Sequence, residues 1–400
     1  MNAVLLSGLA IGFSMLFAYL GYYILMRRLI NKGVNWNKGE VSIKTSLIIA
    51  TYNEEATLPA KLKNVLDLSF PKELLELVII DSGSLDRTPE IVEDFKRKNP
   101  DMNIVFIKEN ERLGKSHALN IAYPKASGTI KIISDSDALL EKSALRNILR
   151  NFNDKTVGAA CGRQILLNAE ESSSTRLEKG YRTIYNVLRE GESLLDSTPI
   201  FHGELSAYRA SLIEQLPENK SADDSRMANI IRKKGYRTVY DVDSVFFEYA
   251  PGNSKGRMVQ KVRRGQGLIR VFWDFKDCMF RRKYGNYGML ILPAEFFIHC
   301  IFPALWLVAI GLFSAGLFMF SPPLLAALMV LIGSVYLVRK LKSRNMFLKK
   351  VKDYATLFNC FSISQLYLFY ALVLWVSGRS LHKWQKVEDV RKQFNLESKP

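Results

Sequence analysis

The position of its long apolar stretches constrains this 400-residue chain more than any other feature. The first stretch, residues 3–26, has no charged side chain and exceeds the roughly 20 residues that cross a hydrocarbon layer of about 30 Å. Arg27, Arg28 and Lys32 follow it directly. A signal peptide carries its basic residues before the apolar run and a cleavage site after it. The order found here therefore predicts an uncleaved N-terminal transmembrane anchor, residues 1–28, with the following residues in the cytoplasm.

A second apolar region lies near the C-terminus. In residues 288–338, the only ionisable side chains of the Asp, Glu, His, Lys or Arg type are Glu295 and His299. A Ser-Pro-Pro sequence at 321–323 divides this region in two. Two crossings joined by a tight turn fit this length, and the uncharged residues 354–378 supply a further candidate. The pattern therefore predicts about three C-terminal transmembrane helices.

The C-terminal transmembrane region, residues 288–378, is followed by a basic tail, residues 379–400. Three crossings would place this tail outside the cell, whereas basic segments favour the cytoplasmic side. Two alternatives stay open: one C-terminal segment is interfacial or re-entrant, or the charge bias fails here. In either case the sequence predicts a multi-pass protein of the cell membrane, with transmembrane helices on both sides of a cytoplasmic middle.

The formal net charge of +17 raises a nucleic-acid alternative, because clustered Lys and Arg neutralise phosphates. Much of the excess, however, lies beside the apolar runs, as in residues 281–283 and 339–352. Anionic lipid head groups explain basic residues at such places. We therefore expect membrane lipids and no nucleic acid as partners, and we interpret residues 251–287 as a basic interfacial segment.

The cytoplasmic middle, residues 40–250, alternates short apolar runs with helical patterns. The runs are β-branched and nearly continuous, which is typical of strands buried on both faces of a sheet. Alternating strands and helices favour right-handed crossovers and an α/β fold with a mainly parallel, Rossmann-like sheet. The predicted strands are residues 46–50, 76–81, 103–108 and 129–134, and the predicted helices are residues 55–67, 86–98, 115–123 and 141–152.

Polar residues gather where each predicted strand ends. In open α/β sheets, ligands bind outside this edge, so we expect a binding site there. The alternative is that these are only loop and N-cap residues, which are also often Asp, Asn, Ser and Thr. The group comprises Thr51, Tyr52, Glu54, Asp81, residues 110–115, Asp135 and Asp137.

The Gly-Lys-Ser sequence at 114–116 is not the end of a phosphate-binding P-loop, because that pattern needs glycine where Glu109 stands. Lys115 still lies at the start of a predicted helix that follows a strand. Helix N-termini favour anions, so this lysine is a candidate contact for a diphosphate. The alternative is a solvated lysine on a helix face.

Asp135 and Asp137 end an apolar run, where two carboxylates are costly to bury unless a cation pairs with them. They form one of several short motifs that occur in a fixed order. The motifs are T-Y-N-E at 51–54, D-S-G-S-x-D-R-T at 81–88, G-K-x-x-A-L-N at 114–120, D-S-D at 135–137, and A-D-D at 222–224 followed by R-K-K-G-Y-R at 232–237.

This ordered set, within residues 46–270, resembles the family 2 glycosyltransferases, which include polysaccharide synthases and lipid-linked-sugar transferases. Membrane-embedded members are the closer match. The resemblance implies a GT-A fold, a UDP- or GDP-sugar as donor, Mg²⁺ or Mn²⁺ as cofactor, and inversion at the anomeric carbon. It also implies that residues 40–250 form the catalytic domain.

The resemblance implies roles for single residues. Asp135 and Asp137 match the D-x-D pair that holds the metal, an arrangement that suits a hard cation with carboxylate, phosphate and water ligands. Lys115 corresponds to a contact with the base or the diphosphate. The residues implied in donor binding are Thr51, Tyr52, Glu54, Asp81, Lys115 and Asp135.

Asp224 aligns with the acid that acts as general base in the family's T-E-D region, although Ala222 and Asp223 replace the commoner Thr and Glu. The alternative is that both acids are only first-turn residues favoured by the helix dipole. Asp224 is our predicted catalytic residue.

The Q-x-x-R-W motif of processive synthases is incomplete. Gln260 and Arg263 match it, but Arg264 stands where tryptophan is expected. That tryptophan would stack on an acceptor sugar, so its replacement argues against long-chain polymerisation. We expect Gln260, Arg263 and Arg264 to contact the acceptor or a diphosphate. The alternative is a polybasic segment that contacts lipid head groups only.

The sequence thus predicts a membrane-bound, metal-dependent glycosyltransferase that transfers a sugar to a lipid-linked or glycan acceptor. One alternative is a processive exopolysaccharide synthase, similar to hyaluronan, cellulose or poly-N-acetylglucosamine synthases, that exports its product. Another is a catalytically inactive membrane adaptor that only keeps the fold.

Overall fold

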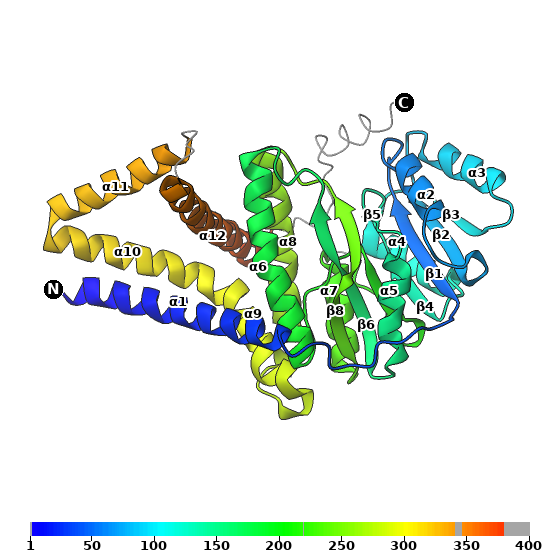
Figure 1. Ribbon diagram of the computed structural model, residues 1–400, viewed down its shortest axis with the longest axis horizontal. Helices are drawn as coiled ribbons and strands as arrows, with labels where there is room; N and C mark the ends of the chain where they lie inside the picture. Colours follow the sequence, from blue (N-terminus) through cyan, green and yellow to red (C-terminus); the bar gives the residue numbers. More distant parts are fainter. Residues whose placement is uncertain (1, 219, 341–345, 380–400) are drawn as a thin grey trace.

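The computed structural model of the protein describes residues 2–218, 220–340 and 346–379 (Figure 1). A β-sheet with flanking helices forms one end, and long apolar helices form the other. Two further helices, α6 and α8, lie between these two parts. All but the first residue of the predicted basic tail, residues 379–400, lies outside the described residues.

The sheet has eight strands in the order β3-β2-β1-β4-β7-β6-β8-β5 within the described residues. The first four in this order are parallel, as predicted. The remainder is mixed, so the sheet is less uniformly parallel than predicted, because β7 lies between β4 and β6 and is antiparallel to both. The strands are β1 Thr45–Thr51, β2 Leu75–Ser82, β3 Asn103–Glu109, β4 Ile130–Ile133, β5 Leu139–Leu140, β6 Val157–Leu166, β7 Ser206–Arg209 and β8 Arg237–Glu248.

Helices cover both faces of the sheet, which explains why its strands are apolar throughout. In β1, Leu47 and Ile49 belong to one buried cluster, with side chains from α2, α3 and α5. Ile48 belongs to a second cluster, with side chains from α4 and α7, because successive strand residues point to opposite faces. These helices are α2 Leu58–Leu66, α3 Thr88–Lys98, α4 Lys115–Lys125, α5 Ala144–Arg150 and α7 Asp223–Lys233.

Two long helices, α6 (Ser173–Leu195) and α8 (Ser254–Asp274), stand between the sheet and the apolar helices (Figure 1). A capping box between Ser172 and Thr175 fixes the start of α6. One face of α8 packs on the last long helix, since α8 shares a buried cluster with Ala371 and Leu374. Helix α8 forms most of the predicted basic interfacial segment.

The apolar end contains α1 (Ala3–Ile30), α10 (Phe302–Phe320), α11 (Pro322–Lys340) and α12 (Met346–Val376). A short helix, α9 (Leu292–Phe296), and π-helical turns at Tyr287–Ile291 and Phe297–Ile301 lead into α10. As the sequence predicts, the chain breaks between α10 and α11 at the Ser-Pro-Pro sequence.

Helices α1 and α10 pack closely because glycine lies on both contact faces. A Cβ atom on Gly8 would lie 2.5 Å from the backbone nitrogen of Phe313, and one on Gly316 would overlap the backbone of Leu5. Such contacts between small residues are common in helix pairs within membranes.

Among the described residues, two helical segments are long and apolar enough to cross a membrane. They are Ala3–Ile30 and the continuous segment Tyr287–Phe320. Two shorter apolar segments, Pro322–Leu331 and Phe361–Val376, belong to α11 and α12. Apolar helices are therefore present on both sides of the polar middle, whereas their crossing of a membrane stays a prediction.

Candidate active site

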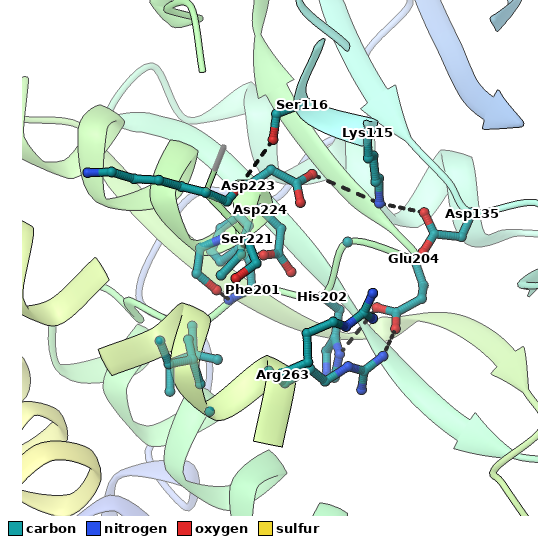
Figure 2. Close-up of a pocket in the computed structure, with 18 of the residues that line it drawn as sticks. Lys115, Ser116, Asp135, Phe201, His202, Glu204, Ser221, Asp223, Asp224 and Arg263 are labelled. Atoms are coloured by element: carbon teal, nitrogen blue, oxygen red, sulfur yellow. Dashed lines mark hydrogen bonds and ion pairs between the residues drawn. The ribbon is translucent and has the colours of Figure 1, made fainter. Parts of the chain in front are cut away.

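A cavity of about 660 Å³ lies outside the carboxyl ends of β1 and β4 and extends between α6, α8 and α12. Figure 2 shows part of its lining, including Lys115, Asp135 and Asp224. The cavity lies at the sheet edge at which a site was predicted. We call its two sides the sheet wall and the helical wall. The sheet wall includes Tyr52, Lys115, Asp135, Asp137, Asp223 and Asp224, and the helical wall includes Tyr181, Arg182, Arg189, Lys261, Arg263 and Arg264.

The D-S-D turn follows β4 directly, and both its carboxylates line the cavity. The side chain of Asp135 accepts a hydrogen bond from Nζ of Lys115 at 2.6 Å. Lys115 is the first residue of α4, and its Nζ also lies 3.9 Å from a carboxylate oxygen of Asp223 (Figure 2). The structure thus brings together three of the predicted motifs, which are up to about a hundred residues apart in the sequence.

A buried lysine holds the D-S-D turn from behind. Nζ of Lys61, in α2, donates to Oγ of Ser134 at 2.6 Å and to the carbonyl of Ala138 at 2.5 Å. These two residues flank the turn, so one side chain fixes both of its ends. Complete burial lowers the pKa of Lys61 to about 7, against the opposing effect of the two aspartates.

The sequence did not predict this role of Lys61, although a signal was present. The lysine lies on the apolar face of α2, between Leu58 and Leu62, where a solvated side chain is not expected. A buried lysine must donate its hydrogen bonds inside the protein, which points to a nearby polar turn.

Asp223 and Asp224 begin α7, and both line the cavity. One carboxylate oxygen of Asp224 accepts from the backbone N–H of Ser225 at 2.7 Å. Burial, with the negative charge of Asp223 as the next cause, raises the pKa of Asp224 to about 7. A carboxyl group with such a pKa is well matched to accept a proton near neutral pH.

Glycine at position 203 leaves room between the lysine and the predicted base. A Cβ atom on Gly203 would lie 3.3 Å from Nζ of Lys115 and 3.4 Å from the second carboxylate oxygen of Asp224. The space that a ligand would use between these two side chains therefore depends on the absence of a side chain at this position.

Of the residues near β1 and β2 that were predicted to bind the donor, all but one line the cavity. Thr51, Tyr52 and Glu54 line it, and the guanidinium carbon of Arg112 lies 4.2 Å from the ring centroid of Tyr52. Asp81 is buried, accepts from Thr51 Oγ1 at 3.2 Å and does not line the cavity. Donor binding by Asp81 stays a prediction, and its observed contact fixes Thr51.

The incomplete Q-x-x-R-W motif lies on α8. Arg263 and Arg264 line the cavity, whereas Gln260, one turn earlier, does not. Arg264, which replaces the tryptophan, donates to the buried carboxylate of Glu204 at 2.5 Å. Here the position therefore carries an ion pair in place of an aromatic ring. Glu204 was not predicted, because nothing near it in the sequence indicates a buried charge.

The helical wall also contains residues that the sequence did not single out. Arg182, Tyr185 and Arg189 project from one face of α6, at spacings of three and four residues, and Glu178 lies one turn before Arg182. Nζ of Lys261 lies 2.9 Å from a carboxylate oxygen of Glu178. This polar stripe was visible in the sequence, but such stripes usually face solvent.

The side chains of the D-S-D turn fit a hard divalent cation. Asp135 and Asp137 are both half-buried and face the cavity. Mg²⁺ and similar ions are usually held by one or two carboxylates, with substrate phosphates and water completing the shell. Among the described residues, no group of three His, Cys, Asp or Glu side chains is placed to hold a metal alone. A metal bound at this turn would therefore need oxygen atoms of a bound phosphate to complete its coordination.

Two family models match the chain. One, described as "Glycosyl transferase family 2", matches residues 46–216, and the other, "Glycosyl transferase family group 2", matches residues 132–376. The chain therefore belongs to the family 2 glycosyltransferases, as its motifs predicted.

Relatives and a solved structure point in the same direction. A probable glycosyltransferase of Bacillus subtilis, YdaM, is 28% identical over 249 residues, which cover 60% of this chain and 59% of the relative. The poly-beta-1,6-N-acetyl-D-glucosamine synthase of Staphylococcus aureus is 25% identical over 290 residues, covering 72% and 68%. The chain thus spans about three fifths of the length of the Bacillus relative.

The mannosyltransferase PcManGT from Pyrobaculum calidifontis, solved in complex with GDP-Man and Mn²⁺, has a similar structure. Its TM-score is 0.76 at 28% identity, and the match covers 93% of this chain and 98% of that one. A glycosyltransferase fold of the GT-A type, predicted from the motifs, is confirmed by this similarity.

Proposed function

We propose that the protein is a membrane-bound, inverting glycosyltransferase. It transfers one sugar from a GDP- or UDP-sugar to a lipid-linked or glycan acceptor on the cytoplasmic side. The observation that carries this proposal is the single cavity that contacts both the D-S-D turn with Asp224 and the helices α6, α8 and α12. The GDP-Man complex of the Pyrobaculum mannosyltransferase supports a nucleotide-sugar donor.

In this proposal, Asp224 accepts the proton of the acceptor hydroxyl as that hydroxyl attacks the anomeric carbon. Attack from the side opposite the departing diphosphate inverts the configuration. The raised pKa of Asp224 makes it a better proton acceptor than an ordinary carboxylate. Lys115 and Arg263 carry positive charge at the cavity, where they stabilise the departing diphosphate.

Asp135 and Asp137 would hold the divalent cation, as Mg²⁺ or Mn²⁺. When bound, such a cation neutralises charge on the diphosphate as it departs. Lys115 forms an ion pair with one carboxylate oxygen of Asp135, so the lysine and the metal would both contact this carboxylate. The Mn²⁺ in the Pyrobaculum complex supports a divalent cation as cofactor.

The proposed domain organisation follows the charge and the apolar helices. Residues 1–28 are the N-terminal anchor, and residues 40–250 are the cytoplasmic catalytic domain. Residues 251–287 are the interfacial segment, and residues 288–378 are the C-terminal membrane region. The two long apolar segments support membrane attachment at both ends of the catalytic domain.

A processive exopolysaccharide synthase is the second candidate, because of the similarity to the Staphylococcus synthase. The ion pair between Arg264 and Glu204 argues for single transfer, since the position of the sugar-stacking tryptophan is used otherwise. Counting the sugars added to each acceptor distinguishes the two candidates.

The proposed function is tested by incubating the purified protein and membranes with a panel of radiolabelled nucleotide sugars and Mg²⁺ or Mn²⁺. Label in the extracted lipid phase supports single transfer to a lipid-linked acceptor. Water-soluble label of high mass supports the synthase. If no nucleotide sugar is bound or consumed, the chain has the inactive adaptor role instead.

A further inference from the structure

The helical wall has more cations than carboxylates, and all of these cations are buried or half-buried. Burial raises the pKa of Glu248 to about 8 and lowers that of Lys261 to about 7, so the excess persists near neutral pH. Among the described residues, the arginines and lysines of this wall and their ion-pair network comprise six cationic side chains and three carboxylates. The cations are Arg182, Arg189, Arg257, Lys261, Arg263 and Arg264, and the carboxylates are Glu178, Glu204 and Glu248. Glu295 lies behind this set, next to His299, and interacts with Arg189 only at longer range.

Most of these charges are already paired. Glu178 accepts from Arg182 at 2.8 Å and lies 3.3 Å from Arg257 and 2.9 Å from Lys261. Arg264 is paired with Glu204. Arg189 and Arg263 are different, because no carboxylate of the described residues lies within 4 Å of either. The charges that act on Arg263 include Asp135 and Asp223 of the sheet wall, so this arginine faces the proposed donor site and Arg189 does not.

Arg189 is buried, with 9% of its surface exposed, and it lines the cavity. One of its terminal nitrogens contacts Nε2 of His202, and its Nε has no hydrogen-bond partner. Burial and the charge of Arg189 lower the pKa of His202 to about 3, so this histidine is neutral. A guanidinium does not release its proton, and a buried charge without a counter-ion is costly. Arg189 is therefore placed to bind an anion.

The cavity also leads from the predicted base toward the apolar helices. Tyr185 of α6 and Tyr367 and Leu368 of α12 line it, together with His299 from the segment that precedes α10. An apolar chain could lie along these side chains while its polar end lies near Asp224. A small water-soluble anion would make no use of them.

We propose that the helical wall binds a lipid phosphate, with the phosphate at Arg189 and the apolar chain between α6, α8 and α12. The inference rests on the proposed function and deepens it, because it gives the acceptor a chemical class. Bound in this way, the phosphate fixes the acceptor so that a hydroxyl of its head group reaches Asp224. A planar guanidinium suits this role because it donates two parallel hydrogen bonds to phosphate oxygens.

Binding of three probes to the full chain in a neutral detergent tests the proposal. The probes are farnesyl phosphate, farnesol and inorganic phosphate, measured by equilibrium dialysis. We expect farnesyl phosphate to bind at least tenfold more tightly than either of the others. Equal affinity for farnesol would overturn the phosphate contact, and equal affinity for inorganic phosphate would overturn the lipid. This comparison needs only the parent chain.

Two variants then locate the phosphate. Arg189→Gln should remove the preference for farnesyl phosphate over farnesol, and Arg189→Lys should keep part of it. Arg176→Gln removes the same charge from an exposed position of the same helix and should bind like the parent. A preference that survives Arg189→Gln would contradict the assignment.

Donor binding, measured on the same samples, separates this inference from the proposed function. Metal-dependent affinity for a nucleotide sugar should be unchanged in Arg189→Gln. A parallel loss of donor affinity would place Arg189 in the donor site and overturn the inference. If the parent binds farnesyl phosphate but no nucleotide sugar, the proposed function is wrong and the lipid-phosphate site is supported.

Discussion

The sheet wall of the cavity gathers Asp135, Asp223 and Asp224 around Lys115 (Figure 2). The helical wall, in contrast, has an excess of cations. Asp135 and Asp137 lie on the turn after β4, and Asp223 and Asp224 begin α7. The cations project from the sides of α6 and α8, two helices that are distant from each other in sequence. This difference in charge is what the proposals require, with a metal-bound donor on one side of the cavity and an anionic acceptor on the other.

If the sheet wall holds the metal-bound donor, the largest effect on donor affinity is expected from Asp137→Ala, which removes a proposed metal ligand from this wall. Metal-dependent donor affinity should fall about 100-fold or more, because a methyl group cannot replace a carboxylate at a hard-cation site. Titration of donor with and without Mn²⁺ measures this. Donor affinity equal to that of the parent in the presence of metal would contradict the assignment of the D-S-D turn.

Lys61→Met tests whether the sheet wall needs its buried support. The methionine fills a similar volume but donates no hydrogen bond to Ser134 or Ala138, so the turn is less well fixed. We expect metal-dependent donor affinity to fall about tenfold, in the range found for residues that orient metal ligands. Lys63→Met, at an exposed position of the same helix, is the matched control. Equal donor affinity in both variants would show that Lys61 acts only on folding.

The pH dependence of kcat/KM tests the role of Asp224 as the base, since it reports the pKa values of the essential groups in the free enzyme. A base works only when ionised, and burial raises the pKa of Asp224 to about 7. The value of kcat/KM should therefore fall as the pH decreases below about 7. Asp223→Asn removes the second cause of the raised pKa and should move this fall to lower pH. An unshifted profile would show that another group titrates.

The smallest effect is expected at Ala222, which precedes the two acids of α7. Its φ of +62° lies in the left-handed region, which costs a side chain about 1 kcal/mol and costs glycine very little. Ala222→Gly should therefore change the free energy of unfolding by no more than about 1 kcal/mol and leave transfer intact. A denaturant titration measures this, and a large loss of transfer would show that the side chain of Ala222 contributes to the site.

The sheet wall could be predicted from the sequence because its features are local. Buried parallel strands are continuous apolar runs, and polar residues that follow them must lie at one edge of the sheet. Strand β7 was missed because it has only four residues and is antiparallel to its neighbours. Its position depends on the whole sheet.

The helical wall could not be predicted in the same way. Arg182 and Arg189 belong to a charged stripe that, in an isolated helix, would face water. In the fold, Glu178 of α6 pairs with Arg257 and Lys261 of α8, and the stripe lines the same cavity as Asp224. Likewise, the partner of Arg264 is Glu204, sixty residues away, and no local pattern indicates the pair.

Measurement of both transfer and donor binding in Asp224→Asn tests the central claim most directly. The asparagine keeps the size of the side chain but cannot accept the proton, and general-base assistance is worth about 10²- to 10⁴-fold. We predict that transfer falls by at least this factor, while the nucleotide sugar and metal bind as in the parent and Asp223→Asn loses much less. Transfer near the parent rate, or a loss explained entirely by weaker nucleotide binding, would contradict the account.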